Sequence, residues 1–354
     1  MAFIHSIGLA KAPYAHRQQD IFNFVMTRYE VPEKDAEKIA RLYERSEIET
    51  RYSAINDFSL PVSEWTFFER ESDTPVEKRM KKFFELAPGL GAEAVANLIP
   101  SEEMLKITHL ITVSCTGVSA PGLDIQLMRL LKLPTDIHRT SVNFMGCYAA
   151  IHVLKQANAI CLSEPDAKVL IVDVELCTLH FQAEYTMDNI ASSLLFADGA
   201  AAVLVSNEKG MYEMADFYAE VALDGYQDMA WDISSSGFLM TLSAYVPAVI
   251  AEKIGPMLHN SLEKMGTKKE EIMHWAIHPG GKKIVTEIKK ALSLSKKDVE
   301  VSRAVLNDYG NMSSVTLFFV LERMRQQIQG ENETIYAVAF GPGLTIETMF
   351  LKSC

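Results

Sequence analysis

Three side chains that lie far apart in the sequence, Cys147, His278 and Asn311, have the chemistry of an acyl-transfer site. A cysteine is a strong nucleophile only as thiolate, and a neighbouring imidazole and the start of a helix both favour that form. We expect His278 to supply the imidazole and a helix to run roughly from Cys147 to Asn158. The Asn311 amide and the His278 Nε–H can hold a developing oxyanion or enolate. The set predicts acyl transfer onto sulfur.

These residues occupy matching places in an internal repeat with a constant offset of 164 residues. Residues 143–150 match 307–314, and residues 113–117 match 277–281. Each copy is expected to contain a strand, a Gly/Pro turn, an Asn-x-x-Gly loop, a helix that opens on small residues, and another strand. Equivalent ends of two related halves converge, so Cys147 should meet the other two residues.

Each residue also has a simpler structural explanation. A cysteine is often a small core hydrophobe, which is our expectation for Cys161. An isolated histidine after a strand is often a capping residue, and an asparagine after a glycine is often a turn or N-cap residue. His274 and His278 have an HxxxH spacing, but the segment is strand-like and lacks the glutamate of zinc hydrolases. We therefore expect no metal site, and the repeat favours the catalytic interpretation.

Five motifs resemble those of type III polyketide synthases, the chalcone synthase-like family, and they occur in family order within residues 5–350. They are Gly146-Cys147-Tyr148-Ala149-Ala150, Leu195 to Ala201, Ile277-His278-Pro279-Gly280-Gly281, Tyr309 to Ser314, and Phe340-Gly341-Pro342-Gly343-Leu344. The resemblance implies an α/β fold of the thiolase-like superfamily, in which duplicated half-domains form a layered αβαβα core. This expectation agrees with the repeat found independently.

The resemblance also implies roles for individual residues. Cys147 resembles the acyl-accepting nucleophile, and His278 and Asn311 resemble the pair that decarboxylates malonyl-CoA and stabilises its enolate. Phe196 matches a gatekeeping aromatic residue beside the active site. Met240 stands where plant enzymes have a second gatekeeping phenylalanine, which predicts a softer gate.

Lys38, Arg41 and Arg45 share one helical face and resemble the cations that meet the CoA phosphates at the tunnel mouth. Alone they would be an ordinary solvated face, since Glu37 and Glu44 interleave with them.

Several departures from the plant pattern concern the acyl substrate. Ala120 replaces the methionine that crosses into the neighbouring subunit, and Trp231 replaces a glycine that lines the plant cavity. The strand end at Cys177 resembles the same strand end in bacterial enzymes that take fatty acyl starters. Within the family, the chain is most similar to the alkylpyrone and alkylresorcinol types. Cys115 and Cys177 then border an apolar tunnel, although core packing would need the same composition.

Composition excludes several other classes. The chain has 354 residues, 48% hydrophobic and 23% charged, with a net charge of −12, which argues against nucleic acid as a partner. Five cysteines in apolar segments suit a reducing cytoplasm. We find no signal peptide, no Gly-rich phosphate loop and no apolar run of about 18 residues, so no transmembrane span is expected.

The coarse pattern predicts helices within residues 17–50, 76–98 and 244–265, and strands within 207–228. The halves are expected at 1–206, carrying Cys147, and 207–354, carrying the other two residues. No low-complexity linker divides them, which predicts one globule.

The leading hypothesis is a synthase that condenses an acyl-CoA starter, preferably fatty acyl, with malonyl-CoA and cyclises the product to a pyrone or resorcinol. It needs no cofactor beyond CoA thioesters, and the family implies a homodimer with Ala120 near the partner's cavity. Two alternatives stay open: an initiating ketoacyl synthase that takes an acyl carrier protein, and a non-catalytic acyl-binding protein of the same fold.

Overall fold

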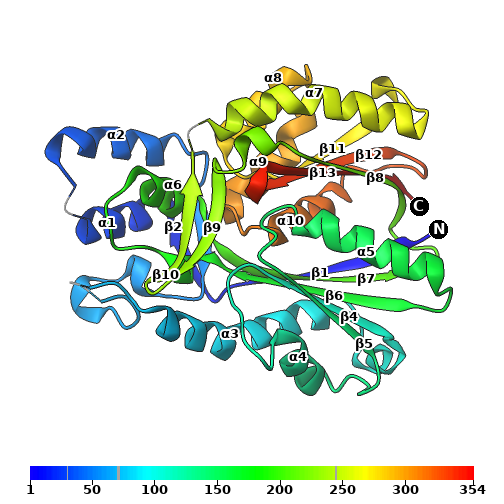
Figure 1. The fold of residues 1–354 in the computed structure, drawn as a ribbon, viewed down its shortest axis with the longest axis horizontal. Coiled ribbons are helices and arrows are strands. Elements are labelled where there is room, and N and C mark those ends of the chain that lie inside the picture. Colours follow the sequence, from blue (N-terminus) through cyan, green and yellow to red (C-terminus); the bar gives the residue numbers. More distant parts are fainter. Residues whose placement is uncertain (30, 70–71, 244) are drawn as a thin grey trace.

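Five layers, in the order helix, sheet, helix, sheet, helix, make up the core of the chain (Figure 1). The computed structural model describes residues 1–29, 31–69, 72–243 and 245–354. Three clusters of buried hydrophobic side chains fill the spaces between layers, one in the middle and one beneath each outer helical layer. The predicted αβαβα fold is confirmed.

Two half-sheets meet edge to edge. The first has the order β5 (His138–Asn143), β4 (His109–Ser114), β6 (Lys168–Leu176), β7 (Asp198–Ser206), β1 (Phe3–Lys11). The second has the order β11 (Ile272–Ile277), β12 (Thr334–Gly341), β13 (Thr345–Ser353), β8 (Tyr212–Val221). Phe3 and Ile4 of β1 pair with Glu213 and Tyr212 of β8, which joins the halves into one nine-stranded sheet.

Helices cover both faces of each half-sheet. One outer layer contains α3 (Val76–Ala96) and α4 (Leu123–Leu131), and the other contains α7 (Val246–Met265) and α8 (Lys282–Ala291) (Figure 1). The middle layer contains α5 (Ala149–Ser163) and α10 (Val315–Met324), with α9 (Glu300–Tyr309) beside α10.

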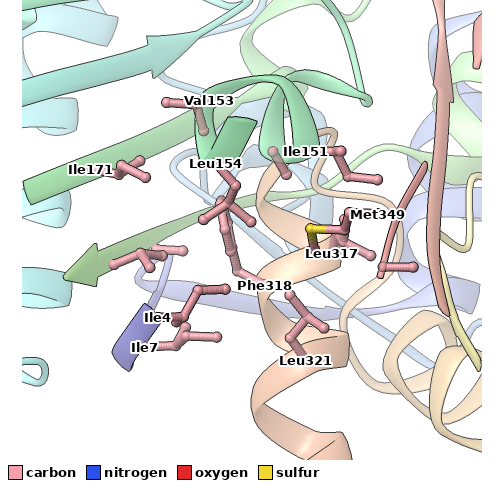
Figure 2. Close-up of a cluster of buried hydrophobic side chains, with 14 of the residues drawn as sticks. Ile4, Ile7, Ile151, Val153, Leu154, Ile171, Leu317, Phe318, Leu321 and Met349 are labelled. Carbon is pink, nitrogen blue, oxygen red and sulfur yellow. The ribbon is translucent and has the colours of Figure 1, made fainter. Parts of the chain in front are cut away.

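The middle layer is apolar on nearly every side because sheets cover both of its faces. Figure 2 shows Phe318 of α10 among Leu154 of α5, Ile4 and Ile7 of β1, and Met349 of β13. Burying one such side chain contributes about 1.5–3 kcal/mol, so this layer stabilises both halves at once.

A smaller set of elements covers one end of the layers. It contains α1 (Gln18–Arg28), α2 (Glu33–Glu44), α6 (Met187–Leu195), the antiparallel pair β2 (Tyr14–Arg17) with β3 (Thr50–Ser53), and the hairpin β9 (Met229–Ser234) with β10 (Gly237–Leu242) (Figure 1). Strands β4 and β6 lead directly into this end, at Cys115 and Cys177. These elements therefore enclose the ends of the strands that carry the predicted site.

The repeat holds for β4 and β11, for α5 and α10, and for β6 and β12. It breaks in the segment just before α5 and α10. The first half has strand β5 where the second has helix α9, so the predicted Asn-x-x-Gly loop is wrong at Asn307, which is helical. Val301 and Val305, at helical spacing, are buried in the core, which favours the helix. The predicted helix from Cys147 begins instead at Ala149 and ends at Ser163.

Candidate active site

The loop that carries Cys147 is fixed by a glycine with a backbone that other residues rarely adopt. Gly146 has φ +83°, and a Cβ at this position would lie 2.2 Å from Cδ of Pro342. The Gly146 N–H donates to Sγ of Cys115, 3.0 Å away. Cys147 is thus held between the end of β5 and the Pro342 turn, two residues before α5.

His278 and Asn311 are held by the second half of the chain. The backbone N–H of His278, directly after β11, donates to the Val338 carbonyl at 2.8 Å. The Ser313 N–H donates to Oδ1 of Asn311 at 2.9 Å, which fixes the orientation of the amide. The amide therefore offers Nδ2–H as its donor, and Nδ2 lies 3.3 Å from the Gly280 carbonyl.

One cavity brings the three predicted catalytic residues together, from both halves of the chain. The predicted pocket residues Cys115, Cys177, Phe196, Trp231 and Met240 line the same cavity, with Ser313, Phe340 and Pro342. Convergence of the repeat therefore gathers Cys147, His278 and Asn311 at one place. Its walls are otherwise almost entirely apolar.

Burial keeps both titratable groups neutral at rest. Burial is the main cause that raises the pKa of the Cys147 thiol to about 12; the nearby Glu175 and Asp173 also raise it, whereas the polar side chains of Ser313 and Asn311 lower it. Burial lowers the pKa of His278 to about 3. The expected help from the helix start does not outweigh this desolvation. A proton passed from the thiol to the imidazole inside the cavity would leave the net charge of the cavity unchanged.

Within the described residues, neither ring nitrogen of His278 has a hydrogen-bond partner. The ring is 1% exposed, so both nitrogens are free to meet a group that enters the cavity. A neutral imidazole presents one N–H donor and one acceptor, which suits polarising a thioester carbonyl.

A wide cavity of about 760 Å³ with a cationic rim adjoins the inner one. The two share Leu242, Gly280 and Ile284 in their walls. Lys38, Arg41 and Arg45, which the resemblance places at a CoA site, line this outer cavity, and Arg45 lies just after the end of α2. Two further cations, Lys282 and Lys283 of α8, lie with them.

A third cavity lies beside the catalytic one and shares Cys177, Phe196, Trp231 and Met240 with it, which include the two predicted gate residues. Nε1–H of Trp231 donates to the Cys115 carbonyl at 2.7 Å, which fixes the indole in the wall that the catalytic and third cavities share. The catalytic and third cavities measure only about 50 and 40 Å³. In this conformation both cavities are therefore narrow.

Comparison with known proteins decides the family. The profile for the N-terminal domain of chalcone and stilbene synthases matches residues 1–209, and the profile for their C-terminal domain matches residues 219–354. The chain belongs to the chalcone and stilbene synthase family. Its members are the type III polyketide synthases, which are condensing acyltransferases that use CoA thioesters and no further cofactor.

Individual relatives agree with this assignment. The alpha-pyrone synthesis polyketide synthase-like Pks18 of Mycobacterium tuberculosis is 33% identical over 88% of the chain and 81% of its own length. A polyketide synthase of Dictyostelium discoideum is 29% identical over 99% of the chain, which spans only 11% of that longer protein.

Solved structures agree as well. The C-terminal type III polyketide synthase domain of Steely1 from Dictyostelium has a TM-score of 0.91 at 28% identity, with 99% of both chains covered. PKS-I from the brown alga Ectocarpus siliculosus has a TM-score of 0.92 at 28% identity, covering 100% of this chain and 98% of that one.

Two residues singled out in the sequence of this polyketide synthase, Ala120 and His274, do not line the catalytic cavity. Ala120 is exposed, in the turn before the cis peptide bond to Pro121, and it lines none of the three cavities above. His274 pairs with Glu333, with 2.5 Å between Nε2 and Oε2.

The described ranges contain no group of three or more His, Cys, Asp or Glu side chains suited to a metal ion. No helix within 1–29, 31–69, 72–243 and 245–354 is long and apolar enough to cross a membrane.

Four residues beside the site were not predicted from the sequence. Ser313 lines the catalytic cavity and lowers the pKa of the Cys147 thiol, although it belongs to one of the five motifs. Lys282 and Lys283 add two cations to the outer cavity. Glu175 is fully buried behind Cys115, and an acidic residue within an apolar strand was the signal that could have found it.

Proposed function

We propose that this chain condenses an acyl-CoA starter with malonyl-CoA and cyclises the product to a pyrone or resorcinol. The observation that carries the proposal is a single buried cavity lined by Cys147, His278 and Asn311, which adjoins an outer cavity with five cations. A thiol, two neutral donors and a cationic mouth suit a CoA thioester.

In the loading step the Cys147 sulfur attacks the thioester carbonyl, the carbon–sulfur bond to CoA breaks, and CoA leaves as the free thiol with the proton from Cys147. Malonyl-CoA then loses CO₂, and the resulting enolate oxygen is held by the N–H donors of His278 and Asn311. The enolate carbon attacks the acyl carbonyl, which releases the Cys147 thiolate. Repeated extension precedes cyclisation.

A fatty acyl starter is our proposal for the substrate class. The walls of the catalytic cavity are apolar, and the similar Pks18 is named for alpha-pyrone synthesis. Each buried methylene contributes about 0.8 kcal/mol, so four further carbons would tighten binding by about 3 kcal/mol before ordering costs. Because the third cavity is narrow here, a long tail requires Met240 and Trp231 to move aside.

We also propose a homodimer and a cytoplasmic location. The exposed Ala120 turn supports the first, because in the resembling family this turn reaches the partner's cavity. Five free cysteines support the second. Sedimentation at working concentration tests the dimer, and a fully active monomer would contradict it.

The decisive experiment uses Cys147→Ala, with Cys354→Ala as a control that removes a thiol outside the three cavities. Both variants are incubated with malonyl-CoA and acyl-CoAs from acetyl to stearoyl. We expect Cys147→Ala to form no polyketide and no acyl-enzyme by intact mass, yet to retain some decarboxylation of malonyl-CoA through His278 and Asn311.

Each alternative predicts a different result in this assay. If Cys147→Ala forms polyketide at the wild-type rate, Cys147 is not the nucleophile. A single condensation that requires an acyl carrier protein would indicate a ketoacyl synthase. Failure of the wild type to become acylated would indicate a binding protein.

A further inference from the structure

A buried arginine of β3 lies between the predicted gate and the predicted catalytic amide. Arg51 is 3% exposed and lines the third cavity together with Phe196. Burial lowers the pKa of Arg51 to about 10, so the guanidinium keeps its charge at neutral pH. Its Nε–H and Nη1–H donate to an amide oxygen and a backbone carbonyl rather than to a carboxylate. An apolar side chain of similar volume often stabilises a fold at least as well, so the contacts of this cation indicate a role beyond stability.

The guanidinium of Arg51 holds the chain at the gate. Its Nη1–H donates to the Phe196 carbonyl at 2.8 Å, and its Nε–H donates to Oε1 of Gln18 at 2.9 Å. The side-chain amide of Gln18 donates in turn from Nε2 to the Leu194 carbonyl at 3.0 Å. Arg51 and Gln18 together therefore fix two carbonyls at the C-terminal end of α6, one on each side of Leu195.

The carbonyl between these two, that of Leu195, is bound to the predicted catalytic asparagine. It accepts the backbone N–H of Asn311 at 2.9 Å, and the Ala197 N–H donates to the Asn311 carbonyl at 2.9 Å. These two bonds make an isolated β-bridge between Phe196 and Asn311. The gate and the amide that faces the substrate thus share one backbone connection.

The stem of Arg51 packs against the other side of this bridge. A Cβ on Gly310, the residue before Asn311, would lie 2.7 Å from Cγ and 2.8 Å from Cδ of Arg51. Gly310 has φ +71°, a backbone that favours glycine. The one arginine therefore holds Phe196 with its charged end and contacts the approach to Asn311 with its methylene groups.

We propose that Arg51 is a positioning residue that fixes the gate residue Phe196 and the amide of Asn311 relative to each other. It acts through the β-bridge rather than on a reacting atom. Arginine suits this place because its planar fork reaches Gln18 and Phe196 at once, whereas lysine has a single nitrogen. The catalytic consequence rests on the proposed function, in which Asn311 holds the enolate of malonyl-CoA.

The test compares Arg51→Lys with a matched control, Arg79→Lys. Arg79 is a second buried arginine, 1% exposed, and its Nε–H and Nη1–H also donate to backbone carbonyls, those of Thr74 at 2.7 Å and Phe181 at 2.8 Å. Both variants keep the charge and lose the fork. A change common to both reports the altered burial of a cation, and a change confined to Arg51→Lys reports the bridge.

Hydrogen exchange followed by peptide mass needs no substrate. The peptides that contain Ala197 and Asn311 should exchange about tenfold faster in Arg51→Lys than in the wild type and in Arg79→Lys, because their two backbone bonds lose support. Gln18→Leu leaves Arg51 in place but removes its Nε partner, and should speed exchange in the same two peptides even if Arg51→Lys does not fold. Wild-type exchange in both variants, or an equal increase in Arg79→Lys, would overturn the proposal.

Release of CO₂ from malonyl-CoA gives the catalytic readout, counted per enzyme that can form the acyl-enzyme at Cys147. Arg51→Lys should lower kcat about tenfold and keep KM within about twofold, because a displaced Asn311 amide affects the enolate and not the cations of the outer cavity. Arg79→Lys should keep the wild-type kcat. An unchanged kcat in Arg51→Lys would contradict the role of Arg51. A wild type that releases no CO₂ would contradict the proposed function instead, and hydrogen exchange would still decide whether Arg51 holds the bridge.

Discussion

Substituting the glycine before Cys147 should damage both the fold and the nucleophile. In Gly146→Ala the new methyl group would lie 2.2 Å from Cδ of Pro342, in a backbone with φ +83°. A left-handed conformation costs a non-glycine residue roughly 1–2 kcal/mol, and overpacking adds about 1–3 kcal/mol. We therefore expect a loss of about 2–5 kcal/mol in the free energy of unfolding, a large share of the roughly 5–15 kcal/mol that is typical of proteins.

Urea denaturation followed by circular dichroism measures this loss. The matched control is Gly89→Ala in α3, where a Cβ would meet no atom within 4 Å. Removing a helical glycine should stabilise by about 0.5–1 kcal/mol. The two variants carry the same chemical change, so a difference between them isolates the strained turn. A Gly146→Ala protein as stable as the wild type would refute the reasoning.

Activity gives a second readout under native conditions. Relief of the contact with Pro342 must shift the Cys147 loop, and a displacement of about 1 Å at a reacting group can cost about a hundredfold in rate. Acylation of Cys147 in folded Gly146→Ala should therefore slow by at least about tenfold. Unchanged acylation would show that the loop tolerates the methyl group.

Three further predictions follow from the cavities. Burial lowers the pKa values of His278 and His180 to about 3 in the folded protein, whereas a histidine in the unfolded chain has a pKa of roughly 6.5. Below that pH the unfolded chain binds more protons, which lowers the free energy of unfolding by about 2 kcal/mol per histidine at pH 5. Urea unfolding at pH 7 and pH 5 should therefore show a smaller loss of stability on acidification for His278→Gln than for the wild type. Cys177→Trp should shift the preferred starter toward shorter chains while acetyl-CoA is still used, and product analysis with an unchanged length profile would contradict a tunnel at this wall. Lys283→Ala should raise KM for CoA thioesters about two- to fivefold at low salt with kcat unchanged, an effect that added salt should diminish; equal KM values would remove Lys283 from the mouth.

Patterns that depend on backbone periodicity were predictable from the sequence. The helix predicted over 76–98 is α3, and that over 244–265 is α7, because their apolar spacing reflects one buried face. The range 17–50 holds two helices rather than one polar helical stretch, since Pro32 cannot continue a helix and precedes α2.

Features that depend on tertiary packing were not predictable. Residues 302–307 correspond to strand β5 in the repeat, yet burial of Val301 and Val305 selects a helix. Ala120 is exposed in the single chain, and its expected place near a partner's cavity stays a prediction. The Asn311 amide is oriented by the backbone of Ser313, a contact that residue type alone does not specify.

Strand β1 has a consequence for the order in which the chain folds. It is the first strand made, but its partner β7 ends at Ser206, and its other edge meets β8. The first half-sheet therefore cannot close during synthesis until more than half of the chain has left the ribosome.

Even then, helix α5 has its sheet on one side only, because α10 begins at Val315. Its uncovered apolar face, which includes Ile151 and Leu154, must wait for the last quarter of the chain. Such a face favours aggregation, so this protein should depend on chaperones during synthesis more than its finished, fully layered core suggests.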